Sequence, residues 1–159
     1  MLKIYPLHEK KSVYPILAYW SYLHWFINRD ISFNLVMHKY KKRAESDELP
    51  CSFVALWDEF PVGMVSLIKK VDLQSREELT PWLSALYVLP DHRNRGIGTE
   101  LINAVLNSSS EKGFKRIFLF LDNRGIIKLE KYYSARGWIY FDDVFDSEGN
   151  NTKILFHEL

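Results

Sequence analysis

The sequence predicts an α/β (α+β) fold: a mixed sheet of about six to seven strands with helices on both faces. Three observations support this fold class. Short apolar runs typical of strands are interspersed with segments of helical periodicity along the 159 residues. Residues 117–121 are apolar at every position, as expected for a strand covered on both faces. A helical segment joins this strand to an earlier one, and such a unit places its two strands parallel through a right-handed crossover.

The N-terminal third is predicted to contain one strand and two helices. A short apolar-leaning run at 1–7 is expected to form the opening strand. Apolar side chains at helical spacing predict a helix over 12–28, with Ser12 as its N-cap. A second helix is expected to begin at Asp30 or Ser32, either of which can cap it.

A hairpin and a charged loop are predicted next. Strands are expected over 51–57 and 61–70, with a turn at 58–59 between them. Gly63 within the second strand indicates a bulge or a close approach of another part of the chain. Residues 72–80 are expected to form a charged loop.

The second half of the chain is predicted to continue the sheet and to close it with a pair of strands. In chain order we expect a strand over 82–89, a helix from Ile97 to Gly113, a strand over 117–121, a helix over 126–136, and strands over 138–141 and 153–157 around a turn at 147–150.

Composition excludes several classes of protein and site. The 21 Lys and Arg against 20 Asp and Glu give a net charge of +1, so a nucleic-acid partner is not expected. The single cysteine excludes a disulfide framework, and the five scattered histidines show no metal-ligand spacing, so no metal is expected. No apolar run approaches the ~18 residues of a membrane span, and the N-terminus lacks a signal-peptide core. We therefore expect one cytoplasmic domain over 1–159, with no membrane partner.

The segment 86–101 carries the most informative motif. An apolar strand ends in a turn with two glycines, Gly96 and Gly98, and a helix follows directly. Such a turn directs several backbone N–H groups to one point, where the helix dipole also favours negative charge. Arg93 and Arg95 add positive charge. The pattern predicts an anion site, most naturally for a phosphate or pyrophosphate.

Two of three possible phosphate motifs do not fit this turn. A dinucleotide fingerprint needs a third glycine where this chain has Leu101. A nucleotide-triphosphate loop needs Gly-Lys-Ser/Thr, but Gly98 is followed by Thr99 and Glu100. The remaining pattern, Arg-x-x-Gly-x-Gly over 93–98, resembles the acetyl-CoA pyrophosphate loop of the GNAT superfamily of N-acetyltransferases.

Two further segments strengthen this resemblance, which covers the chain from about residue 51 to the end. The strand Leu-Tyr-Val-Leu-Pro-Asp at 86–91 has the form that usually precedes the loop in this family. Tyr-Tyr-Ser-Ala-Arg-Gly-Trp at 132–138 resembles the family signature Phe-Tyr-x-x-x-Gly-Phe/Trp. Pro-Trp-Leu at 81–83, before this strand, resembles the same segment in one bacterial branch of the family, whose substrates are mostly unassigned.

The resemblance implies an acyl-CoA N-acyltransferase fold with a splayed pair of central parallel strands and acetyl-CoA as co-substrate. The segment 1–48 would then lie on the acceptor side, and 51–159 would form the acetyl-CoA-binding core. Backbone groups of Leu86 and Val88 would bind the pantetheine arm, and the N–H groups of 93–98 would bind the pyrophosphate. The implied cofactor-binding residues are Leu86, Tyr87, Val88, Arg93, Asn94, Arg95, Gly96, Ile97, Gly98 and Thr99.

Tyr133 is the implied catalytic residue. An amine would attack the thioester directly, the Val88 N–H would stabilise the oxyanion, and the Tyr133 hydroxyl would meet the leaving thiolate. The alternative is that Tyr133 only fills the core. His24 lies on the apolar stripe of the first predicted helix, as a core residue or as a substrate contact.

The resemblance leaves the general base open. Many relatives carry an acid in the strand before the loop, where this chain has Ser84 and Ala85. Asp72, Glu77 and Glu78 are candidates, and a relay of water molecules is an equal alternative. Asp142 and Asp143 are weaker candidates, and an asparagine frequent in relatives is replaced by Ile126, with Asn123 further upstream.

The function expected from this combination is transfer of an acetyl group from acetyl-CoA to an amine, by a monomer or a homodimer. Near-neutral net charge argues against electrostatic steering of a strongly cationic acceptor, so a small-molecule amine is expected. One alternative is an acyl-CoA-binding sensor or partner module with weak or no turnover. Another is transfer of a longer acyl chain.

Overall fold

The computed structural model describes residues 1–73 and 75–159, and within them seven strands form one mixed sheet in the order β1-β2-β3-β4-β5-β7-β6. The strands are β1 (Leu2–Pro6), β2 (Cys51–Trp57), β3 (Phe60–Ile68), β4 (Trp82–Val88), β5 (Arg116–Phe120), β6 (Ile139–Phe145) and β7 (Asn151–Glu158). The α-helices are α1 (Tyr14–Ser21), α2 (Phe33–Arg43), α3 (Ile97–Glu111) and α4 (Ile126–Ser134). The predicted fold class is confirmed.

The chain packs as two compact units. The first comprises Met1–Leu67 and Ser84–Val105, and the second comprises Ile68–Leu83 and Leu106–Leu159. Strands β3 and β4 and helix α3 contribute residues to both units. None of the helices among the described residues is both long and apolar enough to cross a bilayer.

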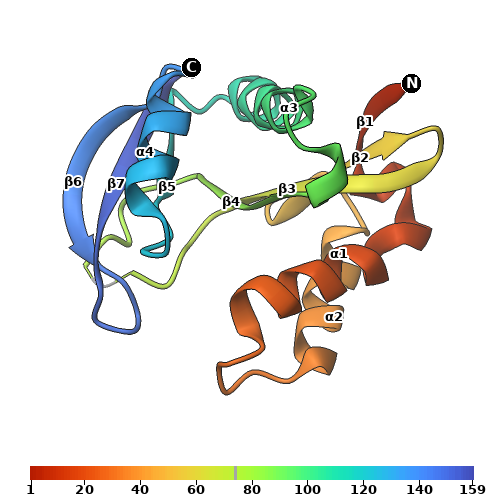
Figure 1. Cartoon of the computed structure of the whole chain (residues 1–159), viewed down its shortest axis with the longest axis horizontal. Helices are drawn as coiled ribbons and strands as arrows, with labels where there is room; N and C mark the ends of the chain where they lie inside the picture. The colour runs from red at the N-terminus through yellow and green to blue at the C-terminus, as the bar shows by residue number, and fades with distance from the viewer. Residues whose placement is uncertain (74) are drawn as a thin grey trace. The chain divides into compact units, whose positions relative to one another are not determined.

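In the first unit, helices cover both faces of an antiparallel sheet. β1 pairs with β2, and β2 pairs with β3. α1 and α2 lie on one face, and the first turns of α3 lie on the other (Figure 1). The core under α1 and α2 consists of buried side chains from helices and strands: Leu7, Leu17, Ala18, Trp20, Val36, Tyr40, Ala44, Val54, Leu56 and Met64.

Both alternatives predicted at Gly63, a β-bulge and a close approach of another part of the chain, are present. Ala55 pairs with Gly63 and Leu56 with Pro61, which leaves Val62 as the extra residue of a β-bulge. Side chains alternate along a strand, so Gly63 faces away from Met64 and toward α3. A Cβ at Gly63 would lie 3.0 Å from the Tyr87 carbonyl oxygen and 3.1 Å from Leu101 Cδ1. Only glycine allows β4 and α3 to approach this closely.

β4 changes conformation in its middle. Its parallel pairing with β5 lies at its first residue, Trp82, opposite Phe118. Ala85 has a φ of 54°, a left-handed conformation that a non-glycine residue adopts at a cost of order 1–3 kcal/mol. The strand therefore bends before the residues Leu86–Val88 that precede the glycine turn. Nothing in the sequence around Ala85 indicates this bend.

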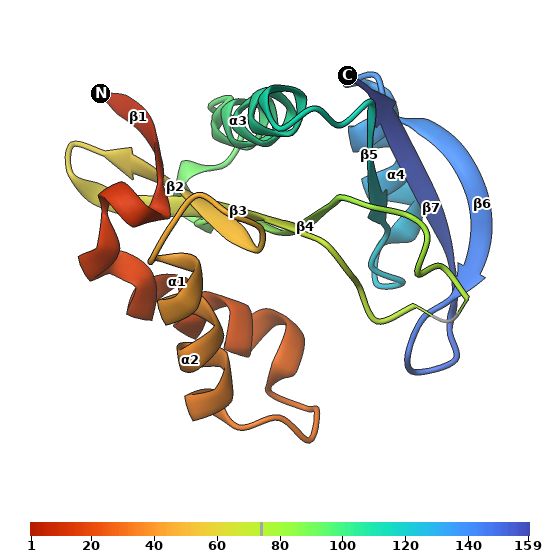
Figure 2. The same ribbon diagram turned by 180° about the vertical axis from the view of Figure 1, so that it is seen from behind.

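In the second unit, α4 lies beside a sheet that ends in an antiparallel hairpin. β7 pairs antiparallel with both β5 and β6, and Figure 2 shows these strands from behind. The buried cluster of this unit contains Leu73, Trp82, Phe118, Val144 and Ile154. The Trp82 indole N–H donates to the Leu79 carbonyl at 2.7 Å, so this fully buried ring keeps its polar atom bonded.

The first helix differs from the prediction. Residues Lys11–Val13 form a short 3-10 turn, so Ser12 lies inside that turn and does not cap a helix. α1 then begins at Tyr14, and Tyr22–Phe26 continue it as a π-helical turn. The predicted cap of the second helix at Ser32 is confirmed, because its hydroxyl accepts a hydrogen bond from the Leu35 N–H at 3.1 Å.

Gly63→Ala is expected to destabilise the protein by about 1–3 kcal/mol, the usual cost of overpacking, because its Cβ would push against a backbone carbonyl and Leu101. Urea denaturation measures the loss. Ser110→Ala, at an exposed position of α3, is the control and should change stability by no more than a few tenths of a kcal/mol. A Gly63→Ala variant as stable as wild type would contradict the close approach.

Candidate functional site

The turn between β4 and α3 has the backbone that an anion site requires. After a 3-10 turn at Pro90–His92, the chain reaches Asn94 with a φ of 59° and Gly96 with a φ of 80°. Asparagine and glycine are the residues that adopt this left-handed region most readily. A Cβ at Gly96 would meet nothing within 4 Å, so the space beside this residue is open.

The N-terminus of α3 adds partial positive charge to the turn. Glu100 donates its N–H to the Gly96 carbonyl at 3.1 Å, which closes the first helical turn. The amides of Ile97 and Gly98 precede this bond and point out of the helix end, as the first amides of any α-helix do. The Ile97 side chain is buried at 1% exposure, so this residue offers its backbone and not its side chain.

The two arginines of the turn lie against neighbouring groups. Arg93 donates from Nε to the Val88 carbonyl at 2.9 Å, and its guanidinium lies 5.7 Å from the centre of the Tyr87 ring. The Arg95 guanidinium lies 5.8 Å from the centre of the Trp57 ring. The Arg93 backbone N–H also donates to the Pro90 carbonyl, at 3.2 Å, so it is not available to an anion. The open space lies beside Gly96, at the start of α3.

Side chains at the end of β4, including those of the predicted binding residues Tyr87 and Val88, point to opposite faces of the sheet. Ala85, Tyr87 and Leu89 pack against the cluster under α1 and α2. The Val88 side chain points the other way, where its Cγ2 is 3.4 Å from the Cβ position of Gly63. The structure thus brings Leu86–Val88 together with the turn 93–98 in one unit.

His24 joins this group from the π-helical turn. Its imidazole is half-buried, and its ring centre lies 4.3 Å from that of Tyr87, with an angle of 33° between the planes. Trp20 contacts the same tyrosine at 5.5 Å between ring centres. Sequence analysis left His24 open as a core residue or a substrate contact. The signal that could have found it is one titratable side chain within an otherwise apolar helical stripe.

Tyr133 lies in the second unit, near the end of α4, and its side chain is 8% exposed. Its ring packs against the rings of Tyr132 and Trp138, with centres 5.2 and 5.8 Å apart. Burial raises the pKa of Tyr133 well above its ordinary value; Tyr132 raises it further and Arg136 opposes the shift. The phenol therefore stays protonated at neutral pH and can act as a hydrogen-bond donor.

The structure explains why a glycine, Gly137, stands in the segment 132–138. Gly137 follows α4 with a φ of 88°, and a Cβ there would lie 3.1 Å from His157 Nε2. The chain then turns, and the Trp138 N–H donates to the Tyr133 carbonyl at 3.2 Å. The spacing between Tyr133 and Trp138 is thus fixed by the way the helix ends.

The acidic residues considered as bases lie in the second unit. Asp72, Glu77 and Glu78 are exposed on the loop between β3 and β4. Asp142 forms an ion pair with Arg76 at 2.8 Å. Asn123 is exposed, between Asp122 and Arg124. Burial raises the pKa of the Asp122 carboxyl, but hydrogen bonds from the Arg124 side chain and backbone N–H, together with the Arg124 charge, lower it below its ordinary value.

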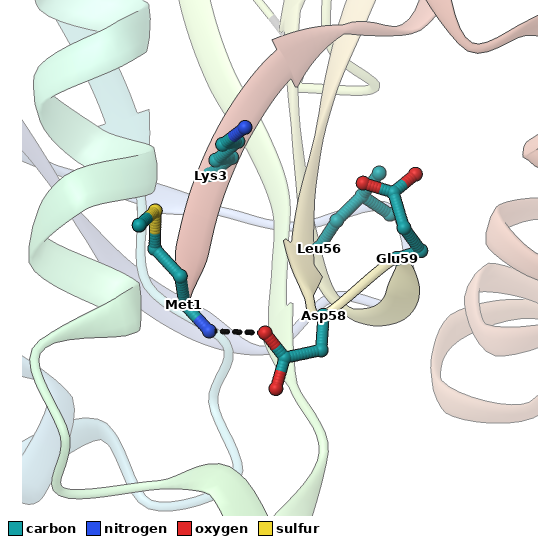
Figure 3. A pocket seen from close by; sticks show the side chains of 5 residues that line it. All are labelled: Met1, Lys3, Leu56, Asp58 and Glu59. Atoms are coloured by element: carbon teal, nitrogen blue, oxygen red, sulfur yellow. Dashed lines mark hydrogen bonds and ion pairs between the residues drawn. The ribbon is translucent and has the colours of Figure 1, made fainter.

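A separate hollow of about 400 Å³ lies at the open end of β1 and β2 and is lined by Met1, Lys3, Leu56, Asp58 and Glu59 (Figure 3). The Met1 ammonium pairs with the Asp58 carboxylate across it. Both groups are largely exposed, so the pair contributes at most about 1 kcal/mol. None of the predicted site residues lines this hollow.

Comparison with known proteins identifies the family. Residues 7–137 match the model of the acetyltransferase (GNAT) family, and the chain belongs to that family of acetyltransferases. No curated protein matches the sequence significantly.

Solved structures share the fold at low sequence identity. A GNAT-family acetyltransferase from Streptococcus pneumoniae aligns over 100% of both chains with a TM-score of 0.70 and 14% identity. YncA from Salmonella typhimurium, solved with its cofactor acetyl-CoA, has a TM-score of 0.72 and 15% identity over 99% of this chain and 94% of its own. A chimera of the spermidine N-acetyltransferase SpeG from Vibrio cholerae and hSSAT has a TM-score of 0.71 and 16% identity, over 99% and 95%.

The raised pKa of Tyr133 predicts that Tyr133→Phe leaves the tyrosinate absorbance of the folded protein at about pH 11 unchanged. In concentrated urea the same substitution should remove one of nine tyrosinate signals, because the unfolded phenol ionises near pH ~10. Above pH ~10 the Tyr133 phenol loses its proton in the unfolded chain but keeps it in the folded protein. The contribution of Tyr133 to the free energy of unfolding therefore falls as pH rises above ~10. Loss of one ninth of the folded signal would contradict the shift.

Proposed function

We propose that residues 1–159 act as one N-acetyltransferase domain that moves an acetyl group from acetyl-CoA to an amine by direct attack. The observation that carries this proposal is the turn 93–98, where two left-handed residues and the start of α3 direct backbone amides into open space next to β4. Membership of the GNAT family agrees with this reading of the turn.

Acetyl-CoA fits the turn through its pyrophosphate. A doubly charged pyrophosphate needs several N–H donors at one point, and amides at the start of a helix provide them without the cost of ordering side chains. The open space beside Gly96 leaves room for phosphate oxygens. The presence of acetyl-CoA in the structure of YncA, which shares the fold, supports the same ligand here.

The pantetheine arm is proposed to run along β4. Amide groups of the arm can bond to the backbone of Leu86 and Val88, as an added strand would. Arg93 Nε already donates to the Val88 carbonyl, and a carbonyl oxygen can accept a second bond. The Val88 N–H is the proposed donor to the oxyanion that forms when the amine attacks the thioester.

Tyr133 is proposed to stabilise the departing thiolate. A phenol is less acidic than a thiol even at its ordinary pKa (~10 against ~8.5), and burial raises the pKa of Tyr133 further. Complete transfer of the phenol proton to the thiolate is therefore unfavourable. The role that fits the raised pKa is a hydrogen bond from Tyr133 to the sulfur in the transition state, with the final proton coming from solvent.

The acceptor is proposed to be a small-molecule amine. The near-neutral net charge gives no long-range attraction for a strongly cationic substrate. The likeness to a chimera of a spermidine N-acetyltransferase supports testing small amines as acceptors. We propose a monomer or homodimer acting without nucleic acid or membrane partners and without a metal.

A second candidate function is an acyl-CoA-binding sensor with weak or no turnover. The observation that favours it is Ala85 in the part of β4 where relatives often carry an acid. The experiment that separates the candidates measures thiol release from acetyl-CoA with phenethylamine, spermidine and Nα-acetyl-lysine, alongside calorimetry with acetyl-CoA. Binding with amine-dependent thiol release supports the enzyme, and binding without it supports the sensor.

Gly96→Val is expected to abolish acetyl-CoA binding, because the side chain would fill the open space and oppose a φ of 80°. Calorimetry measures the affinity. Gly113→Val is a matched control, since Gly113 has a φ of 86°, also has open space around it, and ends α3 away from the turn. Wild-type affinity in Gly96→Val, or equal loss in both variants, would remove the pyrophosphate assignment.

Tyr133→Phe removes one oxygen and keeps the ring. If the hydroxyl stabilises the thiolate, kcat should fall by ~10²-fold or more while acetyl-CoA affinity changes little. The free energy of unfolding should change by no more than ~1 kcal/mol. Tyr132→Phe, at the half-buried neighbour, is the control and should keep kcat. Turnover within about threefold of wild type in Tyr133→Phe would make Tyr133 a core residue only.

A further inference from the structure

We propose that His24 is the base of the reaction, accepting the proton that the amine loses during acetyl transfer. This inference rests on the proposed function, because it assigns a residue to the chemistry of that same site. Its basis is one juxtaposition inside the first unit: the His24 imidazole lies on the ring of Tyr87, and Tyr87 stands between Leu86 and Val88 of β4.

The backbone around His24 is unusual for a helix that only packs. Tyr22–Phe26 form a π-helical turn directly after α1. Such turns are rare and frequently occur at functional sites, because the wider turn changes the direction in which side chains point. His24 is the histidine of this turn, and its side chain is half-buried.

The His24 imidazole lies on the same face of β4 as Ala85, the position where relatives often carry an acid. Ala85 and Tyr87 both pack on the α1 and α2 face of the sheet, and His24 contacts Tyr87 there at 4.3 Å between ring centres. The proposed oxyanion donor, the Val88 N–H, belongs to the next residue. An amine that attacks a thioester held at this backbone is within reach of His24 directly or through one water molecule.

Carboxylates do not offer an alternative on this face. All nine Asp and Glu residues of the first unit, every residue of which the structure describes, are exposed: Glu9, Asp30, Glu45, Asp47, Glu48, Asp58, Glu59, Asp91 and Glu100. Ala85 occupies the part of the strand where relatives often carry an acid. His24 is the half-buried imidazole that contacts Tyr87 on this face.

Cationic side chains lie close to the aromatic rings that flank His24 in the sequence or contact it. On the β4 side, the Arg93 guanidinium lies 5.7 Å from the centre of the Tyr87 ring, and Tyr87 itself is titratable. Arg29, which follows the π-helical turn, and Lys39 on α2 lie 5.7 and 5.8 Å from the centre of the Phe26 ring.

The proton balance of the step is as follows. The nitrogen of a neutral amine attacks the thioester carbonyl, and in the adduct this nitrogen carries a positive charge. A ring nitrogen of His24 takes one proton from it as the carbon–sulfur bond breaks. The products are the amide and the CoA thiolate, which becomes the thiol by taking a proton, and the His24 imidazolium returns its proton to solvent.

The test is the pH dependence of kcat/KM, measured by thiol release with whichever of phenethylamine, spermidine and Nα-acetyl-lysine reacts fastest. In the wild type the amine and His24 must both be deprotonated. The slope of log kcat/KM against pH should therefore be about two at low pH, where both groups must lose a proton, and about one at higher pH, where only the amine must still do so. His24→Gln should lower kcat/KM by ~10²-fold or more and give a slope of one throughout.

Two controls separate chemistry from structure. His38→Gln, at an exposed histidine of α2, should keep the wild-type profile with its change of slope. Melting temperature and acetyl-CoA affinity, measured on His24→Gln and on a second variant, His24→Asn, should stay near wild type. A purely structural role would lower the melting temperature and leave the change of slope in place.

The outcomes distinguish this inference from the proposed function beneath it. A wild-type profile without a change of slope, or a His24→Gln variant within about threefold of wild type that keeps the change, overturns the role of His24 and leaves the acetyltransferase proposal standing. Absence of thiol release from the wild type with all three amines overturns the proposed function, and the role of His24 with it.

Discussion

The close packing at Gly63 is the constraint on which the candidate site depends. It lets the Tyr87 carbonyl and Leu101 approach β3 to a distance that any Cβ would obstruct. β4 and the start of α3 are thereby held against one strand, and the chain must reverse direction within the eight residues 89–96 that connect them. Asn94 and Gly96 adopt left-handed conformations to do so, and the amides at the start of α3 face open space as a result.

Much of the fold could be predicted because its signals are local. The apolar runs of β2, β4 and β5 and the glycine turn follow from period and turn chemistry alone. The π-helical turn at Tyr22–Phe26 could not be predicted, since the same apolar side chains fit an α-helix equally well. Ser12 is not a cap, because Lys11–Val13 form a 3-10 turn before α1, and the residue types there are compatible with either arrangement. The bend at Ala85 has no residue-type signal at all.

The candidate site also combines local features that the sequence predicts with contacts that only the folded structure shows. The glycine turn and the strand before it belong to one contiguous motif, so the sequence alone predicts where they lie. The directions of the side chains do not follow from the motif: Arg93 bonds to the Val88 carbonyl, and Arg95 lies over Trp57. The contact of His24 with Tyr87 joins residues far apart in the chain, so only the folded structure brings them together. The strongly raised pKa of Tyr133 likewise depends on burial that a motif cannot specify.

In the proposed reaction, backbone amides of the turn 93–98 bind the pyrophosphate, Tyr133 stabilises the thiolate and His24 accepts the amine proton. An NMR titration of the isotopically labelled full chain with acetyl-CoA tests the pyrophosphate assignment at the level of single amides. We expect the largest amide shifts at Gly96, Ile97 and Gly98, with smaller shifts along Leu86–Val88. Saturable binding that shifts amides elsewhere and leaves those of 93–98 in place would contradict the account.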